Sequence, residues 1–305
     1  MSVVVTGGSG FIGSHVVDQL LAQGREVTIY DLQPPRYGQR CRFVRGDVRD
    51  VQRLATIFKG CEVVYHLAAE ADVNRFYESP LYSNDVTAAG TLCVLEAARV
   101  SGVARVILAS TEWVYGSARG GGQTTITEDA PYATDPDHLY TSSKIAAELF
   151  CKNYHRLYGV SYTILRYGIP FGDRARPETV TPTFLGRILR NEEITIHGDG
   201  SQSRQFIYVQ DLAAGNVAAL APKAENEIFN LNGREPISVR AIIAALEEIL
   251  GRKAKVRLVA NRAGDFGGLL ISSEKAKRLL GWEPAVPYKD ALERYVRWFR
   301  AEAGL

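Results

Sequence analysis

The chain has 305 residues, and its 36 basic and 34 acidic side chains leave a formal net charge of +2. This length is enough for one large domain or two smaller ones. The balanced charge and the lack of basic runs argue against a nucleic-acid partner. No apolar run reaches membrane-spanning length, and no signal-peptide pattern precedes the first apolar run, so we expect a cytoplasmic protein without a membrane partner.

The cysteines are few and far apart in the sequence. None belongs to a CxxC pair or to a His/Cys cluster with metal-ligand spacing. We therefore expect free thiols in a reducing compartment and no metal site. The residues concerned are Cys41, Cys61, Cys93 and Cys151.

Up to residue 167, short apolar runs alternate with helical patterns. This alternation predicts an α/β fold, a Rossmann-type doubly wound parallel sheet that binds its ligand at the carboxyl ends of the strands. The expected strands include Val3–Val5, Val27–Tyr30, Val63–His66, Val106–Ala109 and Thr163–Leu165. The expected helices include Phe11–Gln23, Val51–Phe58, Asp85–Val100 and His138–Tyr158.

The pattern changes after Tyr167, where glycine, proline and arginine become frequent and the predicted elements are short and mixed. We interpret residues 1–167 as one domain and residues 168–305 as a smaller mixed α/β C-terminal domain. Segments near Arg204–Tyr208 and Ile228–Leu231 are candidates for a return to the first domain. Helices are expected near Phe184–Arg190 and over Asp290–Ala301.

A glycine-rich loop joins the first strand to the first helix. Gly7, Gly10 and Gly13 have the spacing in which one glycine makes the turn, one admits a pyrophosphate and one lets helix pack on strand. The backbone N–H groups at the start of the helix, around Phe11 and Ile12, are suited to binding that pyrophosphate. The loop predicts a dinucleotide site.

Asp31 ends the second expected strand, where a carboxylate can accept hydrogen bonds from a ribose diol. It would repel a 2′-phosphate, which favours NAD, while Arg36 nearby leaves NADP open as an alternative. Asp47 and Val48 follow the third expected strand and are candidates for the edge of the adenine site. A simple turn at the end of a strand explains that pair equally well.

A tyrosine and a lysine lie four residues apart on one predicted helix, so Tyr140 and Lys144 share a face. A nearby ammonium group and a positively charged nicotinamide ring would favour the phenolate form of Tyr140, which makes it a candidate general base. Thr111 ends the fifth expected strand and can hydrogen-bond a substrate oxygen and the tyrosine hydroxyl.

Taken together, these motifs resemble the extended short-chain dehydrogenase/reductase family, in its NAD-dependent nucleotide-sugar epimerase/dehydratase branch. The matching segments run in family order over almost the whole chain: Thr6–His15, Asp31, Asp47-Val48, His66–Ala69, Asn84 with Gly90-Thr91, Ser110–Gly116, Tyr140–Lys144, Leu165–Tyr167, Gly198–Val209 and Leu280–Trp282.

The resemblance implies a catalytic triad of Thr111, Tyr140 and Lys144, with Lys144 also binding the nicotinamide ribose. It further implies that the cofactor is lined by the backbone of Leu67, Ala68 and Ala69 and by the Asn84 side chain. A homodimer is expected through the helices over 85–100 and 138–158.

At the substrate end, the resemblance implies that arginines of the second domain hold the diphosphate of a nucleotide sugar. Arg204 and Arg262 match these positions, and Arg174 and Arg176 are less specific candidates. Glu112, next to Thr111, is a further expected substrate contact. A guanidinium group suits phosphate oxygens.

Two departures from the family pattern bear on the reaction. The usual Arg-x-x-Asn segment reads Arg166-Tyr-Gly-Ile169, so the amide that touches the diphosphate is missing and Gly168 replaces an aromatic residue. Trp113 occupies the place of a second carboxylate, and an indole has no acid–base capacity. Elimination and decarboxylation are therefore disfavoured relative to epimerisation.

The resulting hypothesis is an NAD-dependent nucleotide-sugar epimerase, acting on a UDP-sugar such as UDP-glucose or UDP-galactose at C4 through a transient 4-keto intermediate. A 4-ketoreductase or dehydrogenase is the first alternative, and a 4,6-dehydratase or UDP-glucuronate decarboxylase is less favoured. A redox-sensing NAD(P)-binding protein is the non-enzymatic alternative; such proteins usually lose the tyrosine or the lysine.

Overall fold

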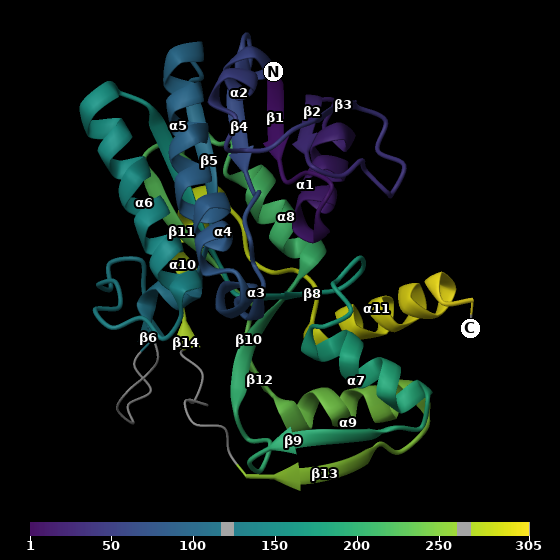
Figure 1. Cartoon of the computed structure of the whole chain (residues 1–305). Coiled ribbons are helices and arrows are strands. Elements are labelled where there is room, and N and C mark those ends of the chain that lie inside the picture. Colours follow the sequence, from purple (N-terminus) through teal and green to yellow (C-terminus); the bar gives the residue numbers. More distant parts are fainter. Residues whose placement is uncertain (117–124, 261–269, 305) are drawn as a thin grey trace.

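The fold is built on one seven-stranded parallel sheet with helices on both faces (Figure 1). The computed structural model describes residues 1–116, 125–260 and 270–304. The strand order is β11-β7-β5-β4-β1-β2-β3. The strands are β1 (Ser2–Thr6), β2 (Glu26–Asp31), β3 (Arg42–Arg45), β4 (Val63–His66), β5 (Arg105–Thr111), β7 (Ser161–Tyr167) and β11 (Glu227–Leu231).

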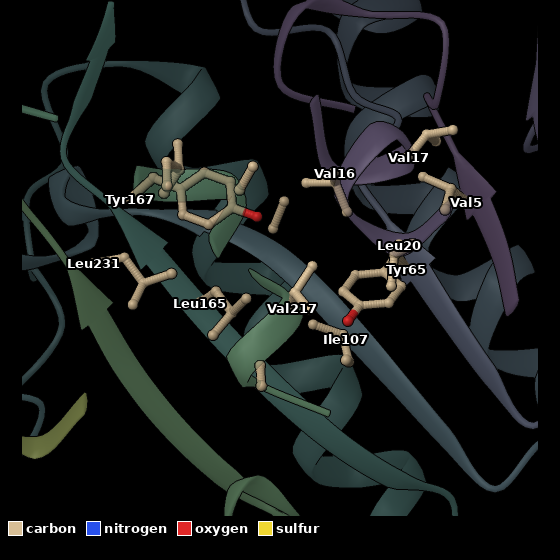
Figure 2. Close-up of a cluster of buried hydrophobic side chains, with 14 of the residues drawn as sticks. Val5, Val16, Val17, Leu20, Tyr65, Ile107, Leu165, Tyr167, Val217 and Leu231 are labelled. Carbon is tan, nitrogen blue, oxygen red and sulfur yellow. The ribbon is translucent and has the colours of Figure 1, made fainter. Parts of the chain in front are cut away.

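Alternate residues of the central strands pack into separate cores on the two faces of the sheet. Val3 and Val5 contact one set of helices and Val4 the other, as the two-residue period of a strand requires. Figure 2 shows part of the first core, where Leu165 and Val217 lie in one apolar cluster. This face is covered by α1 (Phe11–Ala22), α8 (Val209–Ala218) and α10 (Glu274–Leu280); the other by α2 (Val51–Phe58), α5 (Gly90–Ser101) and α6 (Leu139–Tyr158).

Short helices lead into α5. They are α3 (Val73–Glu78), α4 (Pro80–Asn84) and a π-helical turn over Asp85–Ala89. The predicted helix over 85–100 therefore begins in a π-helical turn. A 3-10 turn over Glu112–Tyr115 follows β5, and another covers Pro222–Ala224.

A third apolar core lies beyond the carboxyl edge of the large sheet, among the elements in the lower half of Figure 1. It contains a three-stranded sheet of β8 (Ile169–Phe171), β10 (Ser203–Tyr208) and β12 (Pro236–Ser238). A pair of strands, β9 (Glu193–His197) and β13 (Lys255–Val259), lies beside it, and β6 (Thr125–Ile126) pairs with β14 (Leu270–Ile271). The helices here are α7 (Val180–Leu189), α9 (Val239–Leu250) and α11 (Tyr288–Glu302).

The structure confirms the Rossmann-type parallel sheet and corrects one of the two predicted returns to it. Ile228–Leu231 lies in β11, which pairs with β7 at the edge of the large sheet. Arg204–Tyr208 forms β10 but joins the small sheet, because its partners are β8 and β12. The helix after β10, α8, is the segment that returns, and it packs on α1. The division at residue 167 remains a prediction.

A buried ion pair joins the elements that carry the site. Arg166 of β7 and Glu148 of α6 are 2% and 0% exposed, and Arg166 Nη2 lies 2.7 Å from Glu148 Oε2. Ser110 of β5 donates to Glu148 Oε1 (2.5 Å), and the Tyr132 hydroxyl donates to Oε2 (2.9 Å). The Tyr115 ring lies under the guanidinium group, 4.7 Å from ring centre to Cζ. One carboxylate therefore holds β5, α6 and β7 together.

Replacing Arg166 with alanine should lower the free energy of unfolding by about 3–5 kcal/mol, because Glu148 is left as an unpaired buried charge. The matched control is Arg190→Ala, which removes an exposed pair with Glu192 and should cost no more than about 1 kcal/mol. Urea denaturation of both variants measures the difference. Equally small losses would contradict the role given to the buried pair.

Candidate functional site

The glycine loop closes tightly between β1 and α1. Gly7 has a φ of +72°, and a Cβ on it would lie 2.6 Å from the Ala68 nitrogen. A Cβ on Gly13 would lie 2.1 Å from the Gly7 carbonyl oxygen. These contacts explain why glycine is needed at both positions. The loop thus brings the start of α1 against the end of β4.

The first turn of α1 suits an anionic ligand. Gly10 is the N-cap residue, so no side chain caps this turn, and no acidic residue lies in it. Its backbone N–H groups are therefore available for a pyrophosphate. Asp31 accepts a hydrogen bond from the Ser9 N–H (3.0 Å), which places its carboxylate beside the loop. Uncapped helix and carboxylate together fit the phosphate and ribose groups of NAD.

A single cavity of about 510 Å³ connects this loop to the predicted catalytic residues. It opens between β1 and β4, where the strand order reverses, as expected for this fold. Its wall includes the loop residues Gly7, Gly10, Phe11, Ile12 and Gly13, then Leu67, Ala69, Thr111, Trp113, Tyr140 and Lys144, and finally Tyr167–Phe171, Arg176, Thr179–Thr181 and Phe206.

Thr111, Tyr140 and Lys144 meet in this cavity, although they come from β5 and α6. The Thr111 hydroxyl lies near enough to the Tyr140 hydroxyl to lower the pKa of the tyrosine. Lys144 Nζ donates to the Ala109 carbonyl oxygen at 2.8 Å, which anchors the ammonium group to β5. The tyrosine ring makes an edge contact with Trp113, with ring centres 5.9 Å apart.

The electrostatics of Tyr140 differ from the expectation. Burial raises the pKa of Tyr140 to about 12, and the charge of Arg176 and the nearby Thr111 hydroxyl oppose this rise. Arg176, rather than Lys144, is thus the cation that favours the phenolate. Burial also lowers the pKa of Lys144 to about 8, although the Glu148 carboxylate one turn along α6 opposes the shift.

Glu112 and Arg204 lie behind the wall of the cavity rather than in it. Glu112 is 7% exposed. Burial raises the pKa of its carboxyl to about 8, against the opposing charge of Arg204 on β10, so the carboxyl is protonated at neutral pH. Glu112 and Arg204 thus lie close enough for their charges to interact, while their predicted contact with a substrate remains a prediction. The predicted partner arginine, Arg262, lies outside the described residues.

Several predicted cofactor residues lie away from the cavity. Asn84 is exposed at the end of α4 and accepts a hydrogen bond from Ser143 of α6 (2.9 Å), so it ties two helices together. Asp47 forms an ion pair with Arg49 at 2.6 Å. Val48 is buried in the core of the sheet. These three, like Ala68, contribute no wall to the cavity.

Sequence patterns alone missed other wall residues. Phe206 and the segment Thr179–Thr181 line the cavity from the third core. Phe206 lies in the family-like segment Gly198–Val209 but was not singled out, and Thr179–Thr181 carries no motif by which it could have been found. Arg176 was only one of several candidate arginines. Arg174, its neighbour by two residues, instead pairs with Asp18 of α1 at 2.7 Å. Only the path of the chain after β8 decides which arginine faces the cavity.

A buried histidine next to the glycine loop forms hydrogen bonds with side chains of β1 and α5. His66 ends β4 and is fully buried between Thr6 Oγ1 (2.8 Å from Nδ1) and Thr91 Oγ1 (3.0 Å from Nε2). Thr91 donates its own proton to the Thr87 carbonyl, so Nε2 is the donor to Thr91 and Nδ1 accepts from Thr6. Burial, aided by the charge of Lys144, lowers the pKa of His66 to about 3.

This histidine should make the protein less stable in mild acid. Below its ordinary pKa of 6.5, His66 gains a proton in the unfolded chain but not in the folded one until about pH 3, so stability falls across that window. Between pH 7 and pH 5 the loss is about 2 kcal/mol. His66→Gln should remove that share of the pH dependence in urea titrations, whereas His197→Gln, on the more exposed β9, should retain it. Parallel pH profiles for wild type and His66→Gln would contradict the assignment.

Comparison with known proteins agrees with this geometry. The NAD dependent epimerase/dehydratase family matches residues 3–231. A UDP-glucuronate 4-epimerase of Thermodesulfobacterium geofontis is 35% identical, over 97% of this chain and 95% of its own. The crystal structure of UDP-glucose 4-epimerase from Thermotoga maritima with UDP-glucose has a TM-score of 0.92 and 33% identity, covering 99% of this chain and 100% of that one. That of a dTDP-glucose 4,6-dehydratase from Streptomyces venezuelae, with NAD bound, has a TM-score of 0.91 and 33% identity, covering 100% and 98%.

The chain belongs to the NAD-dependent epimerase/dehydratase family. The expected extended short-chain dehydrogenase/reductase fold is confirmed, as is an NAD-dependent enzyme of the epimerase type. The relatives include both epimerases and a dehydratase, so membership of the family alone identifies neither the reaction nor the sugar substrate. Within the described residues, no helix is long and apolar enough to span a membrane.

Proposed function

We propose that the protein is a UDP-sugar 4-epimerase. The observation that carries this proposal is that one cavity joins the dinucleotide loop to Thr111, Tyr140 and Lys144. A cavity that brings these groups together suits a reaction in which a sugar hydroxyl loses its proton while the carbon that bears it loses a hydride. The UDP-sugar epimerases among the relatives support it.

Each residue has a defined part in this mechanism. Bound NAD supplies a reversible hydride acceptor. Tyr140 removes the proton of the C4 hydroxyl, and Thr111, which lies beside the tyrosine hydroxyl, orients the same oxygen. Lys144 binds the nicotinamide ribose, and the positive charge of Arg176 favours the phenolate of Tyr140. The loop around Gly7, Gly10 and Gly13 holds the pyrophosphate, and Asp31 the adenosine ribose.

The substrate is then held mainly by its nucleotide end. Arg204, together with Arg262, is the proposed partner of the diphosphate, and Glu112 lies beside it. Anchoring at that end would leave the hexose free to turn, so that either face of C4 could be presented to a bound NAD. Trp113 stands beside Tyr140 where elimination would need a second carboxylate, which favours epimerisation over dehydration.

Tyr140→Phe should reduce the interconversion of UDP-glucose and UDP-galactose by about 10²–10⁴-fold, because the phenol proton transfer is lost. The wild type should need no added cofactor, since an epimerase regenerates its NAD in every cycle. Tyr77→Phe is the matched control; this exposed hydroxyl contacts His138 and should be dispensable. Near-normal turnover by Tyr140→Phe would contradict the base role, and a strict need for added reduced cofactor would favour the 4-ketoreductase alternative.

We also propose a homodimer through α5 and α6. Large apolar side chains remain exposed on these helices, among them Val100 (54%), Leu149 (42%), Leu157 (67%) and Tyr158 (54%). Large apolar side chains exposed on two packed helices are typical of an interface between chains. A partner chain on this face would cover the outer side of the helix that carries Tyr140.

Leu157→Glu should shift the protein from dimer to monomer in light-scattering chromatography, because a carboxylate would be buried at the interface. Leu258→Glu is the control, since Leu258 is also exposed (55%) but lies on β13, away from α5 and α6. A dimer that survives Leu157→Glu, or a wild-type monomer, would contradict this interface.

A further inference from the structure

Three neighbouring strands of the large sheet end at the same level. In the register of the sheet, Thr111 of β5 lies opposite Tyr167 of β7, and Tyr167 lies opposite Leu231 of β11. The next residue along each strand is Glu112, Gly168 and Asn232, respectively. Gly168 lines the cavity, whereas Glu112 and Asn232, its neighbours across the sheet, do not line it themselves.

The two flanking side chains carry polar atoms without partners. Asn232 is 1% exposed, and neither its Oδ1 nor its Nδ2 has a hydrogen-bond partner among the described residues. Glu112 is 7% exposed, and its Oε2 is likewise unpaired there. Burying polar atoms without partners costs free energy, so such atoms in a folded protein call for a ligand or a functional reason.

The Asn232 amide lies in the space left by Gly168. A Cβ on Gly168 would lie 2.3 Å from Asn232 Oδ1, so a larger residue at 168 would displace the amide. The next residue, Ile169, is the position at which the family pattern has an amide and this chain has none. The chain therefore has no amide at residue 169, but the unpaired amide of Asn232 lies directly against Gly168.

We infer that Asn232 supplies to the nucleotide sugar the amide contact that Ile169 lacks, reaching it across the bare backbone of Gly168. The inference rests on the proposed function. An amide donates through Nδ2 and accepts through Oδ1, so it suits the oxygens of a sugar hydroxyl or of a phosphate. The Glu112 carboxyl, on the other side of Gly168, also carries an oxygen without a partner among the described residues.

The test is the binding of UDP-glucose and of UDP to the NAD-loaded full-length protein, by calorimetry, together with thermal unfolding without nucleotide. Asn232→Ala should weaken UDP-glucose binding about tenfold, the loss of one well-made hydrogen bond. Its thermal stability without nucleotide should not fall, because the variant removes an unpaired buried amide rather than a bond. If UDP binding weakens equally, the amide contacts phosphate; if it is unchanged, the amide contacts the hexosyl group.

A second variant separates this contact from a structural role. Adding Ile169→Asn to Asn232→Ala should restore UDP-glucose binding, since the amide returns on the other side of Gly168. Normal UDP-glucose affinity in Asn232→Ala, or a lowered melting temperature with unchanged affinity, would overturn the inference. If the wild type binds neither UDP nor UDP-glucose, the proposed function fails, and this inference with it.

Discussion

The site depends on the buried ion pair between Glu148 and Arg166. A charge at 0–2% exposure must be paired, and here one carboxylate is shared by α6, β7 and, through Ser110, β5. These three elements carry the tyrosine and lysine, the bare glycine backbone and the threonine. Glu148 also lies one helical turn from Lys144, and its negative charge opposes the effect of burial, which lowers the pKa of Lys144. A single interaction thus controls both the geometry and the charge of the site.

Burial and nearby positive charge have opposite effects on the pKa of Tyr140, the proposed base. Burial raises the pKa of Tyr140 to about 12, which by itself would make the phenol a poor base at neutral pH. The positive charge of Arg176, which reaches the cavity from the loop after β8, works in the other direction. The charge of Arg176 thus acts on a buried phenol, where charges interact more strongly than in bulk water.

Proteins with the same fold can catalyse different reactions, and the residues that line the cavity determine which reaction occurs. Proteins that share this sheet at TM-scores above 0.9 carry the names of an epimerase and a dehydratase. In this chain Trp113 contacts Tyr140 where a carboxylate would be needed for elimination. The replacement of an aromatic side chain by Gly168 is matched by Asn232, which lies against it. Two departures from the family pattern therefore become local, physically linked features of one wall.

The sequence by itself determined what depends on local geometry. The strand–glycine–helix loop, the alternation of strands and helices and the shared helix face of Tyr140 and Lys144 follow from φ angles and from periods of 2 and 3.6 residues. Only the tertiary structure decided that β10 joins the small sheet, that Asn84 stays outside the cavity, that Arg176 rather than Arg174 faces Tyr140 and that Asn232 lies against Gly168. These contacts join residues far apart in the chain, and their positions depend on strand order and loop path, for which the sequence has no short-range pattern.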